Sequence, residues 1–97
     1  MKPAVMHPAA DAEMNDSAAW YDNQRHGLGR EFLAAVDDAL VAIEEDPDTG
    51  IQVDFGFRMK TLRRFPFGVV FRERATDLHV VAVHHFRRET DYWLERN

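Results

Sequence analysis

Arginine and lysine residues gather in the second half of this 97-residue sequence, where they could bind an anionic partner. Six of them lie on or beside strands predicted there: Arg58, Lys60, Arg63, Arg64, Arg72 and Arg74. A sheet surface with several arginines can bind phosphate groups. It can equally receive an acidic protein segment through bidentate ion pairs. A solvated face without a partner is the third reading, and the sequence leaves all three open.

The first half of the chain is acidic and the second half is basic. The formal net charge is −5 at pH 7. Up to Asp54, three basic residues accompany twelve acidic ones, whereas from Phe55 onward nine basic residues accompany five acidic ones. The split predicts either an acidic and a basic face with different partners, or two halves that neutralise each other within one fold.

Other chemistries find little support in the sequence. The chain has no cysteine, which excludes disulfides, thiolate metal sites and cysteine nucleophiles. Gly27 and Gly29 fall between two predicted helices and do not form a nucleotide-binding pattern. Metal binding requires converging ligands, whereas the adjacent His84 and His85 point to opposite faces of a strand. We therefore expect no metal site and no cofactor.

The first half of the chain predicts a strand followed by a helical hairpin over about residues 8–46. Ala4–His7 is a short apolar stretch, and Pro8 suits the first turn of a helix that runs to about Arg25. A Gly-Leu-Gly turn at 27–29 precedes a second helix, which Pro47 ends. That helix carries one apolar stripe at three- and four-residue steps: Leu28, Phe32, Val36, Leu40 and Ile43.

The second half predicts a sheet over about residues 57–86. The strands are expected at Phe57–Arg63, Phe67–Arg74 and Leu78–Phe86, the last with an apolar run typical of burial on both faces. The C-terminal segment, residues 87–97, predicts a short helix capped by Thr90. The fold class is therefore α+β: an N-terminal strand, a helical hairpin, then an antiparallel three-stranded meander with a short C-terminal helix.

The chain is expected to form a single domain over residues 1–97 and to work in the cytoplasm. Its length suits one small domain and is too short for two. No apolar run approaches the roughly 18 residues that a membrane helix needs. Pro3 and Pro8 interrupt the N-terminus before the apolar core of a signal peptide can form.

Short motifs in order along nearly the whole chain carry a family resemblance: Trp20-Tyr21, Gly27-Leu28-Gly29, Phe32-Leu33, Leu62-Arg63-Arg64-Phe65-Pro66-Phe67, Arg87-Arg88 and Tyr92-Trp93. Together they resemble the ParE/RelE toxin superfamily, most closely its ParE-like "plasmid stabilisation" branch. The resemblance implies the same α+β fold and the toxin half of a type II toxin–antitoxin pair. It also implies a cognate antitoxin that has a DNA-binding domain, ribbon-helix-helix or similar, and a flexible C-terminal segment that wraps the toxin.

Two activities divide that superfamily: ParE-type toxins poison DNA gyrase, and RelE-type toxins cut mRNA on the ribosome. Arg58 and Lys60 resemble the second-strand basic residues of the nucleases, but Gly68 stands where their third-strand arginine aligns. Without that cation, phosphate charge that develops during cleavage loses a stabilising group. An acidic protein also binds RNA poorly, because affinity for RNA rests largely on phosphate neutralisation.

We therefore predict a gyrase-poisoning toxin that acts by binding, without sequence-specific DNA recognition of its own. The alternatives are a ribosome-dependent mRNA endonuclease and an inactive toxin that retains only antitoxin binding. No catalytic residue is assigned; if the protein is a nuclease, the candidates are Arg63, Arg87 and Tyr92.

Two binding surfaces are predicted. Residues at the C-terminal end should contact the target, since Arg, Tyr and Trp dominate binding energy when clustered: Arg87, Arg88, Tyr92 and Trp93. The hairpin and the basic strands should bind the antitoxin over more than roughly 2,000 Å². The residues predicted for that surface are Trp20, Tyr21, Phe32, Val36, Leu40, Arg58, Arg63 and Arg72.

Overall fold

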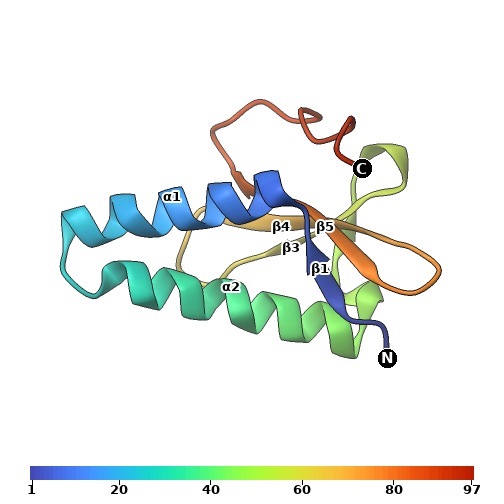
Figure 1. Cartoon of the computed structure of the whole chain (residues 1–97), viewed down its shortest axis with the longest axis horizontal. Helices are drawn as coiled ribbons and strands as arrows, with labels where there is room; N and C mark the ends of the chain where they lie inside the picture. The colour runs from blue at the N-terminus through green and yellow to red at the C-terminus, as the bar shows by residue number, and fades with distance from the viewer.

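The computed structural model describes residues 1–97 and confirms the α+β fold class (Figure 1). In chain order the elements are β1 (Ala4–Met6), α1 (Pro8–Gln24), α2 (Leu28–Glu45), β2 (Ile51–Gln52), β3 (Arg58–Thr61), β4 (Phe67–Glu73) and β5 (Leu78–His85). Short 3-10 turns lie at Pro47–Thr49 and Asp54–Gly56. The strands form one sheet in the order β1-β5-β4-β3-β2, in which only the β1–β5 pair is parallel.

Local chemistry sets the ends of the helices. The Nδ1 atom of His7 accepts a hydrogen bond from the N–H of Ala9 at 3.0 Å, which caps α1 ahead of Pro8. Between the helices, the Asp22 carboxylate accepts hydrogen bonds from the N–H groups of Gly27 and Gly29 at 2.9 and 3.2 Å. A Cβ atom on Gly29 would lie 2.4 Å from the Ala18 carbonyl oxygen, so the close approach of the two helices requires glycine there.

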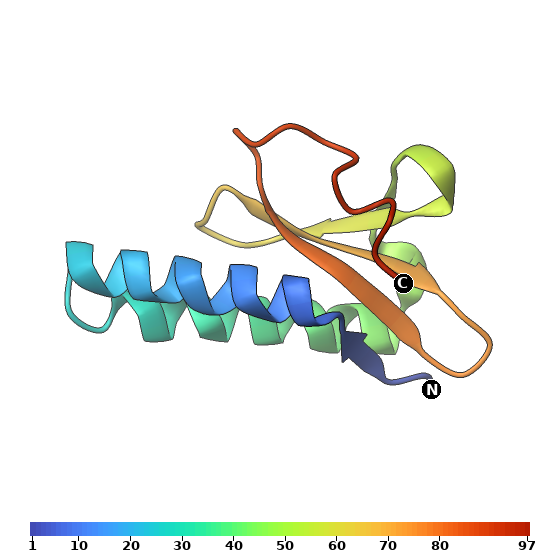
Figure 2. The ribbon, with the colours of Figure 1, turned by 45° about the horizontal axis from the view of Figure 1, so that its top comes forward.

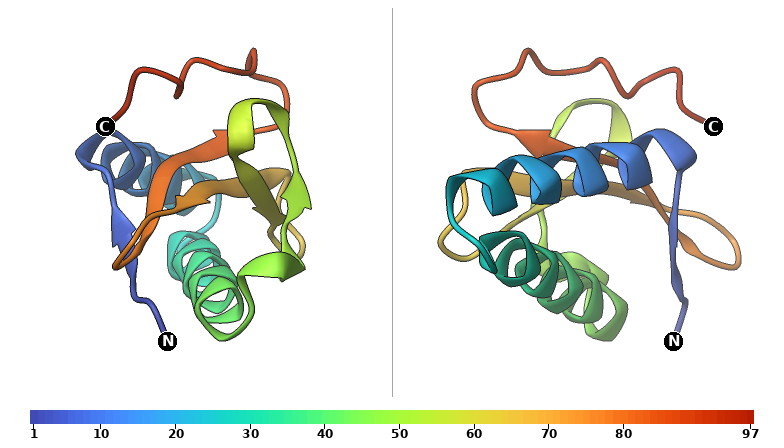
Figure 3. Two further views of the ribbon diagram at one scale, coloured as in Figure 1. Left: turned by 90° about the vertical axis from the view of Figure 1, so that its right-hand side faces the viewer. Right: turned by 60° about the vertical axis from the view of Figure 1, so that its left-hand side comes forward.

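The helical hairpin covers one face of the sheet, and the C-terminal segment crosses the other (Figures 2 and 3). We call these the helix face and the far face. The larger core cluster joins the hairpin to the helix face and includes Phe32, Val36, Ile43, Phe67, Val69, Phe71 and Val80. A smaller cluster lies on the far face: Phe57, Val70, Val81, Ala82 and Trp93. The sheet is therefore the middle layer of three.

Strand β5 contributes to both core clusters because its side chains alternate between the two faces, and a bulge shifts that alternation by one residue. Val70 pairs with Ala82 and Phe71 pairs with Val80, so Val81 is an extra residue in the ladder. The bulge puts Val80 on the helix face and both Val81 and Ala82 on the far face. The prediction of a strand buried on both faces is confirmed.

Two details of the fold differ from the sequence-based expectation. Strand β2 adds a fifth strand within the predicted loop; it is only two residues long and exposed, so it carries no apolar pattern. The predicted C-terminal helix capped by Thr90 is wrong, because residues 87–97 form turns. Asp91 adopts a φ of 71°, and Trp93 is buried on the sheet, so contacts with the sheet replace helical hydrogen bonding. No helix is both long and apolar enough to cross a membrane.

Candidate functional site

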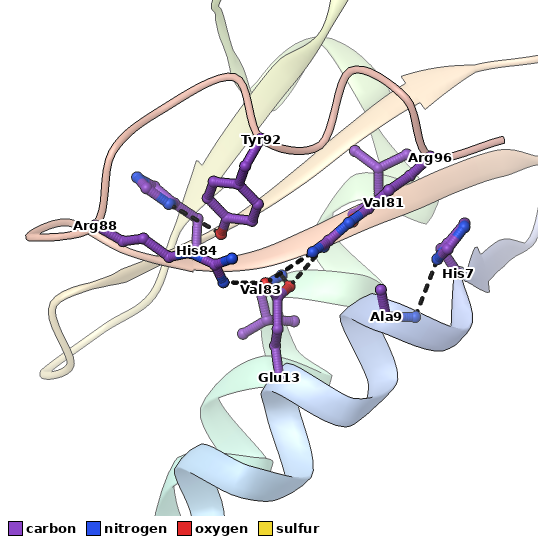
Figure 4. Close-up of polar contacts among 9 residues, drawn as sticks. All are labelled: His7, Ala9, Glu13, Val81, Val83, His84, Arg88, Tyr92 and Arg96. Atoms are coloured by element: carbon purple, nitrogen blue, oxygen red, sulfur yellow. Dashed lines mark hydrogen bonds and ion pairs between the residues drawn. The ribbon is translucent and has the colours of Figure 1, made fainter.

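The C-terminal segment is held to helix α1 and to the edge of β5 by one carboxylate, that of Glu13 (Figure 4). Its oxygens accept hydrogen bonds from Arg88 at 2.6 Å, from Arg96 at 2.9 Å and from the N–H of Val83 at 3.1 Å. Arg96 also donates to the Val81 carbonyl at 2.8 Å. Strand β1 ends before this stretch of β5, so side chains satisfy the backbone groups that a longer β1 would have paired.

Tyr92 lies at the centre of the same cluster. The Arg88 guanidinium stacks 3.5 Å from its ring centroid and that of Arg96 lies at 4.9 Å. The Tyr92 hydroxyl lies 3.2 Å from Nδ1 of His84. Burial raises the pKa of Tyr92 to about 12 and lowers the pKa of His84 below its ordinary value. At neutral pH the cluster therefore contains a protonated phenol beside a neutral imidazole.

The structure places the four predicted target-binding residues in different environments. Arg87 is exposed, and its guanidinium forms no ion pair. Arg88 is half-exposed but bound to Glu13, and Tyr92 is half-buried under it. Trp93 is only 2% exposed and packs in the far-face core. As part of the core that the C-terminal segment closes, the side chain leaves almost no surface open to a target here, and its role as a target contact stays a prediction.

The basic residues of the second predicted strand segment, Arg58 and Lys60, do not lie on the same face of the sheet as Tyr92. Arg58 pairs with Phe71 and Lys60 pairs with Val69 across β3 and β4, which places both basic side chains on the helix face. Tyr92 lies on the far face. Basic second-strand residues and the C-terminal tyrosine are therefore separated by the sheet.

Gly68, Arg63 and Tyr92 also lack the surroundings that a nuclease site would need. A Cβ atom on Gly68 would lie 2.5 Å from Cγ of Met59, so the methionine side chain fills the space beside this glycine. Arg63 is exposed in the β3–β4 turn and forms no hydrogen bond or ion pair with another residue. With its pKa raised to about 12, Tyr92 is also a poor general base at neutral pH.

The predicted basic sheet face does not exist as a single surface. Arg72 lies on the far face over the Phe57 ring at 5.8 Å, opposite the side that carries Arg58 and Lys60. Arg64 pairs with Glu31 on α2 at 2.9 Å. Arg74 forms two hydrogen bonds of 2.6 Å with Asp77 in the β4–β5 turn. The expectation of one shared face was wrong because alternate residues and turns send these side chains in different directions.

The hairpin residues predicted to bind an antitoxin are divided by burial. Phe32 and Val36 are fully buried in the core of the domain, so neither leaves surface open to a partner here, and their role in antitoxin binding stays a prediction. Trp20 is 58% exposed on α1, and Tyr21 and Leu40 are half-buried. Of the five hairpin residues predicted for the antitoxin surface, these three leave apolar surface open to a partner.

Two concavities flank the hairpin, and sequence reasoning missed both. The larger, which we call the α2 groove, has a volume of about 760 Å³ and runs between α2 and the β3–β4 turn. Four alanines of α2 form its floor: Ala34, Ala35, Ala39 and Ala42. Their helical spacing was the available signal. The smaller, the α1 cleft, holds about 360 Å³ between Trp20, Tyr21 and the end of β5.

Comparison with solved structures identifies a related fold. A solved structure described as the chromosomal ParDE TA system from P. aeruginosa contains a chain that superposes with a TM-score of 0.66 at 21% sequence identity. The match covers 88% of this chain and 96% of that one. No family model and no curated protein sequence matches the chain. The likeness shows that the two chains share a fold, in agreement with the fold that the sequence resemblance implied.

Proposed function

We propose that this protein is the toxin of a type II toxin–antitoxin pair and that it works in the cytoplasm. The observation that carries the proposal is the fold it shares, over 88% of its length, with a chain of the ParDE system. The proposed partner is a cognate antitoxin with a DNA-binding domain, ribbon-helix-helix or similar, and a flexible C-terminal segment.

We propose further that the toxin acts by binding DNA gyrase and has no chemistry of its own. The position of Arg58 and Lys60 on one face of the sheet and Tyr92 on the other supports this choice, because a phosphodiester cannot contact both groups at once. The main alternative is a ribosome-dependent mRNA endonuclease. Gly68 argues against the nuclease, because it stands where the resemblance places the phosphate-stabilising arginine. The Met59 side chain fills the space beside this glycine.

For the antitoxin we propose the α2 groove and the exposed Trp20 as contact sites. Lys60 and Arg63, which form no ion pair, lie on one wall of that groove beside Arg64, whereas Glu31, the partner of Arg64, and Asp38 line the α2 side. The alanines of α2 allow a chain to approach closely. An acidic segment suits such a wall. A partner that fills the groove and continues over Trp20 would bury more than roughly 2,000 Å², as permanent complexes do.

Expression of the protein alone in bacterial cells tests the proposal. We expect growth arrest, induction of the DNA-damage response, and mRNA that stays intact when its 5′ ends are mapped. Co-expression of the neighbouring small open reading frame should restore growth. Codon-phased mRNA cleavage would establish the nuclease instead, and normal growth with a stable antitoxin complex would establish the inactive toxin.

A further inference from the structure

Strand β5 has an unpaired stretch on the edge that faces α1. Strand β1 pairs with β5 only from Leu78 to Val80, and its last bond is the one from the His7 N–H to the Val80 carbonyl at 2.8 Å. The chain then enters α1 at Pro8. The rest of β5, up to His85, therefore has β4 on one side and no strand on the other.

The strand register shows which backbone groups face this open edge. The Val83 N–H donates to Glu13 at 3.1 Å, so Val83 turns its backbone groups away from Val69 of β4 (Figure 4). Phe67, which lies opposite His85, makes its backbone hydrogen bonds within the β3–β4 turn. In an antiparallel pair, residues that do not bond to each other point their N–H and C=O groups to the opposite edge. The Val83 C=O and the His85 N–H thus face the open edge, and no group of the chain bonds to either.

These two groups have the spacing that an added strand requires. Residues two apart on a strand direct their backbone groups to the same neighbouring strand. An extended segment beside His84 can therefore donate to the Val83 C=O and accept from the His85 N–H. Glu13 and Arg96 already bond to the edge groups that precede these, so the open stretch is short and begins at a fixed point.

The α1 cleft adjoins the open edge and offers contacts for side chains. Val83 and His85 line it from the strand, and Trp20 and Tyr21 line it from α1. Its volume of about 360 Å³ lies within the roughly 300–1,000 Å³ of pockets that bind ligands. Trp20 is 58% exposed there, and tryptophan is among the residues that contribute most to binding when a partner covers them. The cleft thus combines unpaired backbone with an open aromatic surface.

We propose that the open edge of β5 binds an extended segment of a protein partner as an additional strand. The backbone of the segment pairs with the Val83 C=O and the His85 N–H, as peptides do when they extend a sheet. Successive residues of a strand point to opposite faces, so alternate side chains of the segment point to the helix face. There an apolar or aromatic side chain enters the α1 cleft and packs against Trp20. The site is independent of the proposed toxin function, because it depends only on the sheet and on α1.

A tethered segment tests the site at millimolar effective concentration. A flexible Gly/Ser linker of about 15 residues joins the C-terminus of the full chain to the segment Thr-Val-Thr-Phe-Thr-Val-Thr. We expect hydrogen exchange of the His85 amide, followed by NMR, to slow by about tenfold or more, because its N–H gains a hydrogen bond. The Val83 amide, which Glu13 already binds, should exchange as before. A proline segment of the same length has no N–H to pair with Val83 and should leave the His85 amide unaffected.

Paired variants on α1 locate the segment in the cleft. Ser17 lines the α1 cleft, so Ser17→Phe should fill part of it and return His85 exchange to the rate seen without the segment. Ala19→Phe places the same side chain at an exposed position outside the cleft and should keep the slow exchange. Fast His85 exchange despite the tethered segment, equal slowing by the proline segment, or slow exchange retained in Ser17→Phe would overturn the proposal.

Discussion

The Glu13 side chain pairs with the part of the β5 edge that strand β1 does not reach. Its carboxylate satisfies the N–H of Val83 on the open edge of β5 and binds the two arginines that anchor the C-terminal segment, Arg88 and Arg96. Only 14% of the Glu13 side chain is exposed. Ion pairs this sheltered lose more when one partner is removed than exposed pairs do, because the remaining charges stay desolvated.

Replacing Glu13 by Gln should therefore destabilise the protein by about 2 kcal/mol, since it leaves two arginines without their carboxylate. Urea unfolding followed by circular dichroism measures the change. Glu31→Gln is the matched control, because Glu31 also pairs with two arginines but is more exposed. We expect the control to lose less stability; an equal loss in both variants would show that Glu13 has no special structural role.

Arg87 is the predicted target contact that remains free. Its guanidinium has no ion pair, so Arg87→Ala should change the free energy of unfolding by no more than about 0.5 kcal/mol. If Arg87 contacts the target, the variant should lose toxicity while it still binds the antitoxin. Arg30→Ala removes a second exposed arginine, on α2, and should stay toxic. Full toxicity of Arg87→Ala would move the active surface away from the C-terminal end.

At the scale of elements, the close contact between α1 and α2 depends on Gly29. A methyl group there would meet the Ala18 carbonyl oxygen at 2.4 Å, and backbone cannot yield as a flexible side chain would. Gly29→Ala should therefore destabilise the protein by about 1–3 kcal/mol, despite the better helix propensity of alanine. Thermal unfolding against the neighbouring Arg30→Ala variant checks this. A more stable Gly29→Ala protein would mean that the helices are less tightly packed than described.

Strand β5 makes the stability depend on pH through its histidines. Burial, followed by the nearby charges of Arg74, His7 and Arg72, lowers the pKa of His79, and burial likewise lowers that of His84. The unfolded chain then binds protons first, so stability is full above the ordinary pKa of 6.5 and is lost as the pH falls below it.

We expect the free energy of unfolding, measured in urea, to decrease between pH 7.5 and pH 5.5. His79→Leu should flatten that decrease, and it should not destabilise the protein at pH 7.5, because Nδ1 of His79 is buried without a partner. His26→Ala is the control, since that side chain is fully exposed. An unchanged slope in His79→Leu would assign the pH dependence to other groups.

The elements that could be predicted from the sequence were those with a strong local pattern. The stripe from Leu28 to Ile43 gave α2, and the run from Val80 to Val83 gave the buried strand β5. The C-terminal segment could not be predicted in this way, because its conformation depends on Glu13, some 75 residues earlier, and on the sheet surface under Trp93. The same holds for the basic residues: their types were evident, but strand register and turns decide which face each one occupies.

For the whole molecule, the sheet separates two surfaces with different properties. The helix side carries the hairpin, the α2 groove and the basic wall of Lys60, Arg63 and Arg64. The far side carries the C-terminal segment and an apolar core patch. The α1 cleft, which lies between the hairpin and the end of β5, is lined by Glu13, His85 and Arg88 among others. The two sides of the sheet therefore offer a partner surfaces of different shape and charge.

A single reconstituted assay tests the proposed mode of action, binding to DNA gyrase without nuclease activity, most directly. Purified protein is incubated with DNA gyrase, supercoiled plasmid and ATP, and in parallel with ribosomes that carry a defined mRNA. We predict protein-dependent linear plasmid after detergent and protease treatment, which reports trapped gyrase–DNA cleavage complexes, together with intact mRNA. Cleavage of the mRNA in phase with its codons, with no linear plasmid, would contradict the account and identify a ribosome-dependent nuclease.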